Sequence, residues 1–412
     1  MGGQSEFVWD CLPILQTSKK PNQTCGSGGV FMKKNRLKIL YIIDQLSFGG
    51  SEQHLTQVLR HLDRALFEPH LYVLHGKWDL LPEIEQSGIP CRKIGLPNIL
   101  TAKAVGKIPY WVREIQRGKF QILHTYLFAS NLYGQILGAL AGVPVRISSR
   151  REMAAWMGRR HIVINRFVNR FVHRWIGVSE AVAESAAAVE KVPRGRLTVI
   201  PNGVDVRKFS PSNARNGYFS KANIPDNAPL ILNVGSYRPV KGQVTFVQAC
   251  QRVLSRRPDV HCAIVGEARE PVLSKIRRQL QTGGGGANIH LLPPTNRMER
   301  VYPGAALLVS SSYFEGFSNT ILEAGASGVP VVATAVGGNP EAVKPGENGL
   351  LVPPGNPEKM ARAILKLLEK PARRDELKKR SRHFVENTFS LEKMVETMQT
   401  YYLKWYDEAR RG

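Results

Sequence analysis

Short apolar runs, separated by polar stretches that contain glycine, recur along most of this chain. The first run is LKILYIID at 37–44, followed by the loop QLSFGGSEQ and by an amphipathic stretch from 51 to 62. Short apolar runs next to turn residues are typical of buried strands, and longer periodic stretches are typical of helices. The pattern therefore predicts a strand, a glycine turn and a helix at the start of a folded domain.

Similar units follow in two groups, which we interpret as two domains. Apolar runs recur as HLYVLHG, FQILHTY and VPVRISS in the first group, and as PLILNVG, HCAIVGE and VPVVAT in the second. Strands that alternate with helices predict an α/β class with doubly wound, Rossmann-like sheets. We expect domains at 37–205 and 229–390, separated by a linker rich in Asn, Pro and Ser at 206–228.

The two ends of the chain differ in pattern. Residues 1–36 show no periodicity and contain glycine clusters, so we expect a disordered extension, with Met32 as an alternative start. The last segment, 391–412, has apolar residues at helical spacing, which predicts a helix with one buried stripe. This stripe consists of Leu391, Met394, Val395, Met398, Tyr401, Tyr402 and Trp405.

Composition narrows the class of protein. The chain has 412 residues, 43% of them hydrophobic, which is enough to fill two cores. The five cysteines form no C-x-x-C pair, so they indicate neither a disulfide framework nor a metal motif. We find no apolar run long enough to span a bilayer and only a poor secretory signal, so we expect a cytoplasmic protein.

Positive charge is the next strong feature. Lysine and arginine number 57 against 33 acidic residues, a net charge of +24, and segment 146–175 holds eight arginines against Glu152 alone. Within HIVINRFVNRFVHRWIGVSE, arginine recurs every fourth residue up to Arg174, which predicts one amphipathic helix through Trp175. Two interpretations are open: core packing with a solvated basic face, or contact with an anionic membrane surface.

The most informative motif is SSYFEGFSNTILEAGASGVPVVATAVGGNPE at 311–341, which places Glu315 and Glu323 across the start of a predicted helix. A ligand lying along that helix between the two carboxylates would span roughly 12 Å, about the extent of a sugar joined to a ribose. A diphosphate would then lie near the helix amino terminus, where anions are favoured. Taken alone, either glutamate is also compatible with a merely structural role.

The order EGFSNTILEA, SGVPVVAT and GGNPE resembles the donor site of the family 4 glycosyltransferases, retaining enzymes with the GT-B fold of two Rossmann-like domains. The resemblance covers about 37–405 and implies that the terminal helix crosses back to the first domain. It also implies that Glu315 binds the donor sugar and Glu323 the ribose. The backbone between them would assist, at Gly316, Phe317, Ser318 and Asn319.

Further site residues follow from the same resemblance. Relatives carry a glycine pair after the first strand, here Gly49 and Gly50, and hold the nucleotide base near the position of Gly266. They place a lysine six residues after a glycine, which matches Lys241, and an arginine directly after that glycine, where this chain has Ser236. We expect Arg238 to supply the missing charge, so that both cations face the diphosphate, work that other glycosyltransferases give to a metal.

His124 lies near the carboxyl end of the predicted strand FQILHTY, and open α/β sheets bind ligands at strand ends. Relatives often carry this histidine and a second one two residues later, where this chain has Tyr126. We therefore weigh a catalytic role at the acceptor for His124 against a structural hydrogen bond to the backbone.

The resemblance implies a retaining, metal-independent glycosyltransferase that needs no cofactor and uses a UDP-, GDP- or ADP-sugar as donor. Its acceptor would be a saccharide or a lipid-linked molecule, in the biosynthesis of a lipopolysaccharide, a polysaccharide or a glycolipid. Alternatives within the fold are a sugar-nucleotide epimerase and a phosphorylase or sucrose-type synthase. A nucleic-acid binder is suggested by charge alone, and we expect no nucleic-acid partner, because the chain shows no RNA or DNA motif.

Overall fold

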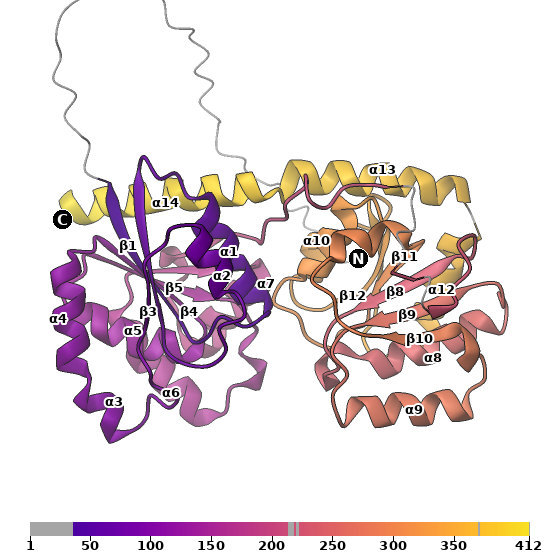
Figure 1. Cartoon of the computed structure of the whole chain (residues 1–412), viewed down its shortest axis with the longest axis horizontal. Helices are drawn as coiled ribbons and strands as arrows, with labels where there is room; N and C mark the ends of the chain where they lie inside the picture. Colours follow the sequence, from indigo (N-terminus) through magenta and orange to yellow (C-terminus); the bar gives the residue numbers. More distant parts are fainter. Residues whose placement is uncertain (1–35, 213–217, 220–221, 370, 412) are drawn as a thin grey trace, which may run out of the picture. The chain divides into compact units, whose positions relative to one another are not determined.

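The computed structural model describes residues 36–212, 218–219, 222–369 and 371–411. In these residues the strands form two separate sheets, and every neighbouring pair of strands within a sheet is parallel (Figure 1). The predicted class, α/β with two Rossmann-like sheets, is confirmed. The extension expected at 1–36 lies outside the described residues, except for Arg36.

The first sheet has seven strands in the order β3-β2-β1-β4-β5-β6-β7. The change of direction in this order falls between β1 and β4, which makes their carboxyl ends the expected ligand edge. The strands are β1 Leu37–Ile43, β2 Phe67–Val73, β3 Cys91–Lys93, β4 Ile122–Tyr126, β5 Val145–Arg150, β6 Arg174–Gly177 and β7 Leu197–Val199. The helices are α1 Gly50–His61, α2 Leu81–Gln86, α3 Ala102–Gly106, α4 Ile108–Gly118, α5 Phe128–Leu140, α6 Arg159–Val168 and α7 Glu180–Ser185.

The second sheet has six strands in the order β10-β9-β8-β11-β12-β13, with its change of direction between β8 and β11. The strands are β8 Leu230–Val234, β9 His261–Val265, β10 Ile289–Leu292, β11 Leu307–Ser310, β12 Val331–Thr334 and β13 Gly349–Val352. The helices are α8 Gln243–Leu254, α9 Val272–Thr282, α10 Asn319–Ala326, α11 Asn339–Ala342, α12 Pro357–Leu368 and α13 Pro371–Thr388, followed by α14 Leu391–Arg411.

Strand β1 shows why these apolar runs fold as central strands. Its alternate residues Ile39, Tyr41 and Ile43 belong to the core beneath α1 and α14, whereas Leu40 and Ile42 belong to the core beneath α4 and α5. A strand covered by helices on both faces needs apolar residues at every position, not at every second one. The run LKILYII meets that requirement from Ile39 onward, and its one polar residue, Lys38, is half-buried near the start of the strand.

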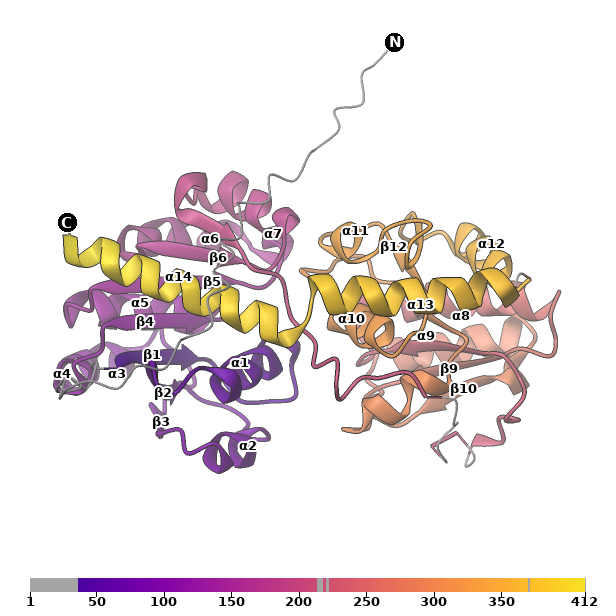
Figure 2. The ribbon, with the colours of Figure 1, turned by 90° about the horizontal axis from the view of Figure 1, so that it is seen from above.

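The last helix, α14, completes the core of the first sheet. Its residues Met394, Met398, Tyr402 and Trp405 are buried in the same cluster as β1 and α1. Figures 1 and 2 show α14 lying along the first domain, whereas the preceding α13 lies along the second. The apolar stripe of the predicted terminal helix is therefore buried against the other end of the chain.

Two crossings between the domains run side by side. The amide of Val204 donates to the carbonyl of Phe389, and the amide of Leu391 donates to the carbonyl of Val204, each at 2.9 Å. A Cβ at Gly203 would lie 2.7 Å from Cα of Leu391, so glycine allows this close approach. The guanidinium of Arg382 adds a hydrogen bond of 2.8 Å to the carbonyl of Val206. These contacts hold the outgoing and returning segments together.

The single helix predicted through Trp175 is wrong in its second half. Helix α6 ends at Val168, a short turn follows, and Arg174 and Trp175 lie in strand β6. The physical reason is pairing in the sheet, because β6 is held between β5 and β7 and buries Trp175. Phe167, an apolar residue of the part that does form helix α6, is 51% exposed.

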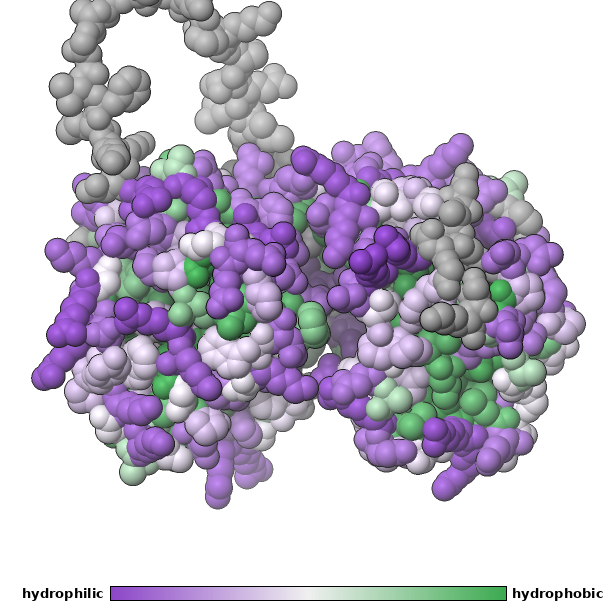
Figure 3. Space-filling model, viewed as in Figure 1, coloured by the Kyte–Doolittle hydropathy of each residue, from purple (hydrophilic) through white to green (hydrophobic). Residues whose placement is uncertain are grey.

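The surface is mostly polar. Hydrophilic residues cover most of the face in Figure 3, and hydrophobic residues gather beside β9, β10 and α9. None of the helices among the described residues combines the length and apolar character that crossing a bilayer requires.

Candidate functional site

The carboxyl ends of β8 and β11 bring a lysine and a glutamate together. Lys241 ends the short helical turn Pro239–Lys241 after β8, and Glu315 lies in the loop after β11. Nζ of Lys241 donates to Oε1 of Glu315 at 2.6 Å, and the hydroxyl of Ser312 donates to the same oxygen at 2.8 Å. Both charged side chains keep some exposure, 25% and 12%. The pair therefore lies at the edge where a doubly wound sheet binds its ligand.

Backbone contacts fix the two loops against each other. The amide of Tyr313 donates to the carbonyl of Val240 at 2.8 Å, and the hydroxyl of Ser311 donates to the carbonyl of Lys241 at 2.9 Å. Gly242 has φ +62°, and a Cβ there would lie 2.1 Å from the carbonyl oxygen of Ser311. Only glycine satisfies both conditions, so the sequence VKG sets the position of Lys241.

Gly337 and Gly338 pack against the backbone of Glu315 and Gly316. The amide of Gly338 donates to the carbonyl of Gly316 at 3.2 Å. At Gly337, with φ +50°, a Cβ would lie 1.7 Å from the carbonyl oxygen of Glu315. The two glycines of the GGNPE motif therefore pack their backbone directly against Glu315 and Gly316. This contact links the GGNPE motif to the EGFSNTILEA motif.

Glu323 lies one turn into α10, and this changes the predicted geometry. Because α10 begins at Asn319, Glu315 lies in the loop before the helix, and the predicted 12 Å span along one helix is wrong. The buried hydroxyl of Tyr302 donates to Oε2 of Glu323 at 2.7 Å, a contact that the sequence did not reveal. Burial raises the pKa of Glu323 to about 7.

The amino terminus of α10 lies beside the first domain. The side-chain amide of Asn202 donates to Oδ1 of Asn319 at 2.6 Å, and a Cβ at Gly50 would lie 3.6 Å from Nδ2 of Asn319. Ser318, the residue before the helix, makes no side-chain cap hydrogen bond. The first amides of α10 are therefore not used by that cap and are available to an anion.

Gly316 is a meeting point of several segments. Its carbonyl accepts a hydrogen bond of 2.8 Å from the hydroxyl of Ser179, just before α7. A Cβ at Gly316 would lie 2.2 Å from the carbonyl oxygen of Arg151, which directly follows β5. The neighbouring Glu341 accepts hydrogen bonds from the amides of Glu180 and Ala181, at 3.0 and 3.3 Å. These contacts could not be predicted from the sequence, because only the fold brings the segments together.

Arg151 is the most unusual charged group near this edge. Its Nε is buried without a hydrogen-bond partner among the described residues, while its terminal amino group donates to Oδ1 of Asn202. Burial lowers the pKa of Arg151 to about 10. Sequence analysis counted Arg151 only as part of a basic segment, although its place directly after a strand is a recognisable signal.

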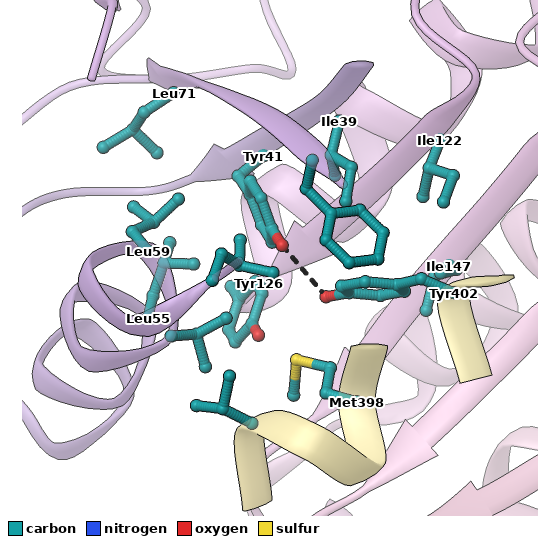
Figure 4. Packing of buried hydrophobic residues seen from close by; sticks show 14 of the residues in the cluster. Ile39, Tyr41, Leu55, Leu59, Leu71, Ile122, Tyr126, Ile147, Met398 and Tyr402 are labelled. Carbon is teal, nitrogen blue, oxygen red and sulfur yellow. Dashed lines mark hydrogen bonds between the residues drawn. The ribbon is translucent and has the colours of Figure 1, made fainter. Parts of the chain in front are cut away.

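The structure does not bring His124 to this site. Its side chain is fully buried, with Nδ1 2.7 Å from the hydroxyl of Tyr402 and Nε2 2.8 Å from that of Ser149. Tyr402 also forms a hydrogen bond of 3.2 Å with Tyr41, and Figure 4 shows both hydroxyls inside the packed cluster. The partners are side chains, whereas the structural alternative for His124 had named the backbone. These contacts favour the structural interpretation of His124, and its catalytic role stays a prediction.

The other residues that we expected at the site differ in their exposure and packing. Arg238 is exposed and directly precedes the turn Pro239–Lys241. A Cβ at Gly266 would lie 2.1 Å from the carbonyl oxygen of Gly235, so packing already accounts for that glycine. Gly49 caps α1, and Phe317 buries its ring 5.4 Å from that of Phe389, which leaves only its backbone for a ligand. The described part of the chain contains no group of three or more His, Cys, Asp or Glu residues that could hold a metal.

Comparisons with known proteins agree with this arrangement. Residues 48–208 match the family model described as Glycosyltransferase Family 4, and residues 215–384 match the model described as Glycosyl transferases group 1. Together with the two sheets and the Lys241–Glu315 edge, these matches define the class. The chain belongs to the family 4 glycosyltransferases with the GT-B fold.

Two groups of relatives are informative. The D-inositol 3-phosphate glycosyltransferase of Segniliparus rotundus is 29% identical to this chain, over 68% of this chain and 66% of that protein. The D-inositol 3-phosphate glycosyltransferase of Rhodococcus erythropolis is 28% identical, over 76% of this chain and 74% of that protein. The alignment to the first thus spans just under two thirds of its length. Anabaena HepE in complex with UDP-glucose has a TM-score of 0.78 at 19% identity, covering 90% of this chain and 100% of HepE. Sucrose-phosphate synthase from Thermosynechococcus elongatus has a TM-score of 0.74 at 22% identity, covering 90% and 100%.

Proposed function

We propose that this enzyme transfers a sugar from a nucleotide-sugar donor to an acceptor hydroxyl, with retention at the anomeric carbon. The observation that carries the proposal is the contact of 2.6 Å between Lys241 and Glu315 at the switch point of the second sheet. A cation and a carboxylate side by side suit a donor that is anionic at its diphosphate and rich in hydroxyls at its sugar. The structures of HepE with UDP and UDP-glucose, which share the fold, support a donor of this class.

Each residue has a distinct task in this mechanism. Lys241 moves from Glu315 to the diphosphate and stabilises the charge that develops on it as the bond from the anomeric carbon to phosphate oxygen breaks. The amides at the start of α10 add partial positive charge. Glu315 then accepts hydrogen bonds from the sugar, and Glu323 from the ribose. The acceptor oxygen forms the new bond on the same face, and its proton passes to the departing phosphate oxygen.

The donor site is tested by thermal stabilisation of the purified protein with UDP-, GDP- and ADP-sugars. We expect one nucleotide series to raise the melting temperature, and Lys241→Ala to lose that shift because it removes the charge at the diphosphate. Arg277→Gln, an exposed change on α9, is a matched control that should keep it. If no donor stabilises the folded wild type, or if Lys241→Ala keeps the full shift, the assigned donor site is wrong.

For the acceptor, the buried Nε of Arg151 favours a phosphorylated polyol. Arg151 follows β5 beside Gly316, and a buried guanidinium with an unused N–H is suited to a phosphate oxygen. The relatives whose printed name is D-inositol 3-phosphate glycosyltransferase support an acceptor of this chemistry.

The acceptor is tested by comparing D-inositol 3-phosphate with inositol, using the donor that gives the thermal shift. We expect transfer only to the phosphorylated compound, a loss of about 100-fold in Arg151→Gln, and an unchanged donor shift in that variant, because a charged hydrogen bond contributes about 1.5–3 kcal/mol. Equal transfer to both compounds would exclude the phosphate contact. Product analysis also separates a transferase from an epimerase, which would alter the donor without any acceptor, and from a phosphorylase, which would require inorganic phosphate.

A further inference from the structure

One face of α6 exposes apolar and basic residues together. Val163 is 65% exposed and Phe167 51% exposed, and these two residues lie one helical turn apart. We define the α6 surface as these two residues with the exposed arginines Arg159, Arg160 and Arg170; the guanidinium of Arg166 donates instead to the carbonyl of Val189. The guanidinium carbon of Arg170 lies 5.9 Å from the centre of the Phe167 ring. The surface is therefore apolar at its centre and positively charged around it.

Packing inside the domain does not require this arrangement. The inner face of α6 buries Asn165 and Val168, and Asn165 donates to Sδ of Met157 at 3.5 Å. A helix that served only the core would place its apolar residues inward and polar residues at 163 and 167. Here a buried asparagine and an exposed phenylalanine reverse that order, which indicates a partner for the outer face.

The charge of the region identifies the kind of partner. Positions 153–179 contain five arginines and no aspartate or glutamate. The net charge of the whole chain, +24, has the same sign. Trp156, in the short turn Ala154–Trp156 before α6, is 48% exposed, and its ring lies 5.6 Å from that of Phe128 and 5.3 Å from that of His161. Arginine around apolar side chains, with a neighbouring tryptophan, is the composition of helices that lie in the interface of an anionic bilayer.

We propose that the α6 surface binds the surface of an anionic lipid bilayer, with Val163 and Phe167 entering the acyl boundary and the arginines contacting lipid phosphates. This surface lies outside the site at Lys241 and Glu315, and its occupancy does not depend on the reaction proposed above. It is nevertheless close in sequence to Arg151, whose carbonyl packs at Gly316. Membrane docking through α6 would thus act on the same segment that reaches the site.

The proposal is tested by sedimentation of the full chain with sucrose-loaded vesicles. Vesicles of phosphatidylcholine alone are compared with vesicles that contain about 30 mol % phosphatidylglycerol, at about 0.1 M and 0.5 M NaCl. We expect binding to the anionic vesicles that is weaker at high salt, and a partition coefficient lower by at least about tenfold in Arg159→Gln/Arg160→Gln. A similar loss is expected in Val163→Ser/Phe167→Ser, because burial of these side chains drives insertion.

A matched control removes the same charge elsewhere. Arg277→Gln/Arg278→Gln changes two exposed arginines of α9 and should keep wild-type vesicle binding. Equal losses in both arginine variants would mean that binding reflects net charge alone and would overturn the assignment to α6. Failure of the wild type to bind anionic vesicles would also overturn it. A third outcome would overturn it as well. If a single-stranded oligonucleotide abolished vesicle binding and also protected the α6 arginines from modification, the partner would be a nucleic acid.

Discussion

Nδ1 of His124 lies 2.7 Å from the hydroxyl of Tyr402, although 278 positions separate the two residues in the sequence. The same hydroxyl forms a hydrogen bond with Tyr41 in β1, so one side chain of α14 joins two central strands of the first sheet. All three side chains are fully buried. The returning helix is thus held by polar contacts inside the core as well as by apolar packing.

Replacing Tyr402 by phenylalanine tests this connection. The change removes one hydroxyl and leaves the ring nitrogen of His124 and the hydroxyl of Tyr41 buried without it, which should cost about 1–3 kcal/mol of unfolding free energy. Urea unfolding measures the loss. Tyr401→Phe, at the next position and half-buried, should stay within about 0.5 kcal/mol of the wild type. Equal stability of Tyr402→Phe and wild type would show that the buried contacts contribute nothing.

The stability of the fold should depend on pH through His124. Burial and the nearby charge of Arg151 lower the pKa of His124 to about 3 from 6.5, so in this range protons bind mainly to the unfolded chain. The contribution of the neutral His124 imidazole to the unfolding free energy is fully present above about pH 6.5. It decreases by about 1.4 kcal/mol per pH unit as the pH falls toward 3.

His124→Gln isolates this effect, because buried carboxyls such as Glu323, whose pKa is raised, change stability with the opposite sign. We expect the difference in unfolding free energy between wild type and His124→Gln to shrink between pH 6 and pH 4. A difference that stays constant across this range would contradict the low pKa.

Nucleotide affinity should depend on pH through Glu323. Its pKa of about 7 means that the carboxyl is largely protonated at pH 6, whereas hydrogen bonds from a ribose favour the ionised form. Lowering the pH from 8 to 6 should therefore weaken UDP binding about tenfold, as measured by calorimetry. In Glu323→Gln the affinity should be lower at pH 8 and nearly constant on lowering the pH. An identical pH profile in both proteins would remove Glu323 from the ribose contact.

Gly316 should not tolerate a side chain. A Cβ there would lie 2.2 Å from the carbonyl oxygen of Arg151, so Gly316→Ala must push the loop away from β5. We expect a loss of about 1–3 kcal/mol in unfolding free energy, as for other overpacked sites. Gly106→Ala is the matched control, because a Cβ at Gly106 would meet nothing within 4 Å. If Gly316→Ala and Gly106→Ala unfolded at the same urea concentration, the loop at Gly316 would be able to move away from Arg151 at little cost.

Seven of the thirteen described strands could be predicted, because buried parallel strands need nearly continuous apolar runs: β1, β2, β4, β5, β8, β9 and β12. LKILYII in β1 and the run that gives β12 are examples, since both strands are apolar except for Lys38 and Thr334. Glu315, Lys241 and Asn319 were named from the family resemblance. The structure brings Lys241 and Glu315 into contact, and the roles of all three in donor binding stay predictions. The prediction placed Glu315 at the start of the helix, whereas α10 begins at Asn319. The close packing of Gly337 against the carbonyl of Glu315 keeps residue 315 in the preceding loop.

Other features could not be read from local pattern. Arginine at every fourth position suggested that α6 continued to Arg174, but pairing of β6 with β5 and β7 prevailed over the helical period. The environment of His124 depends on a helix at the other end of the chain, and Glu323 depends on a hydroxyl from Tyr302. Such long-range partners leave no periodic signal.

The return of α14 to the first sheet also sets the order in which the domains can be completed during synthesis. Translation delivers β1 to β7 first, but the core beneath them stays open until Met394, Met398 and Tyr402 leave the ribosome. The second sheet, by contrast, has all six of its strands translated before α14 begins. Domains generally fold as units while the chain is made. In this protein the domain that is translated first is therefore finished last.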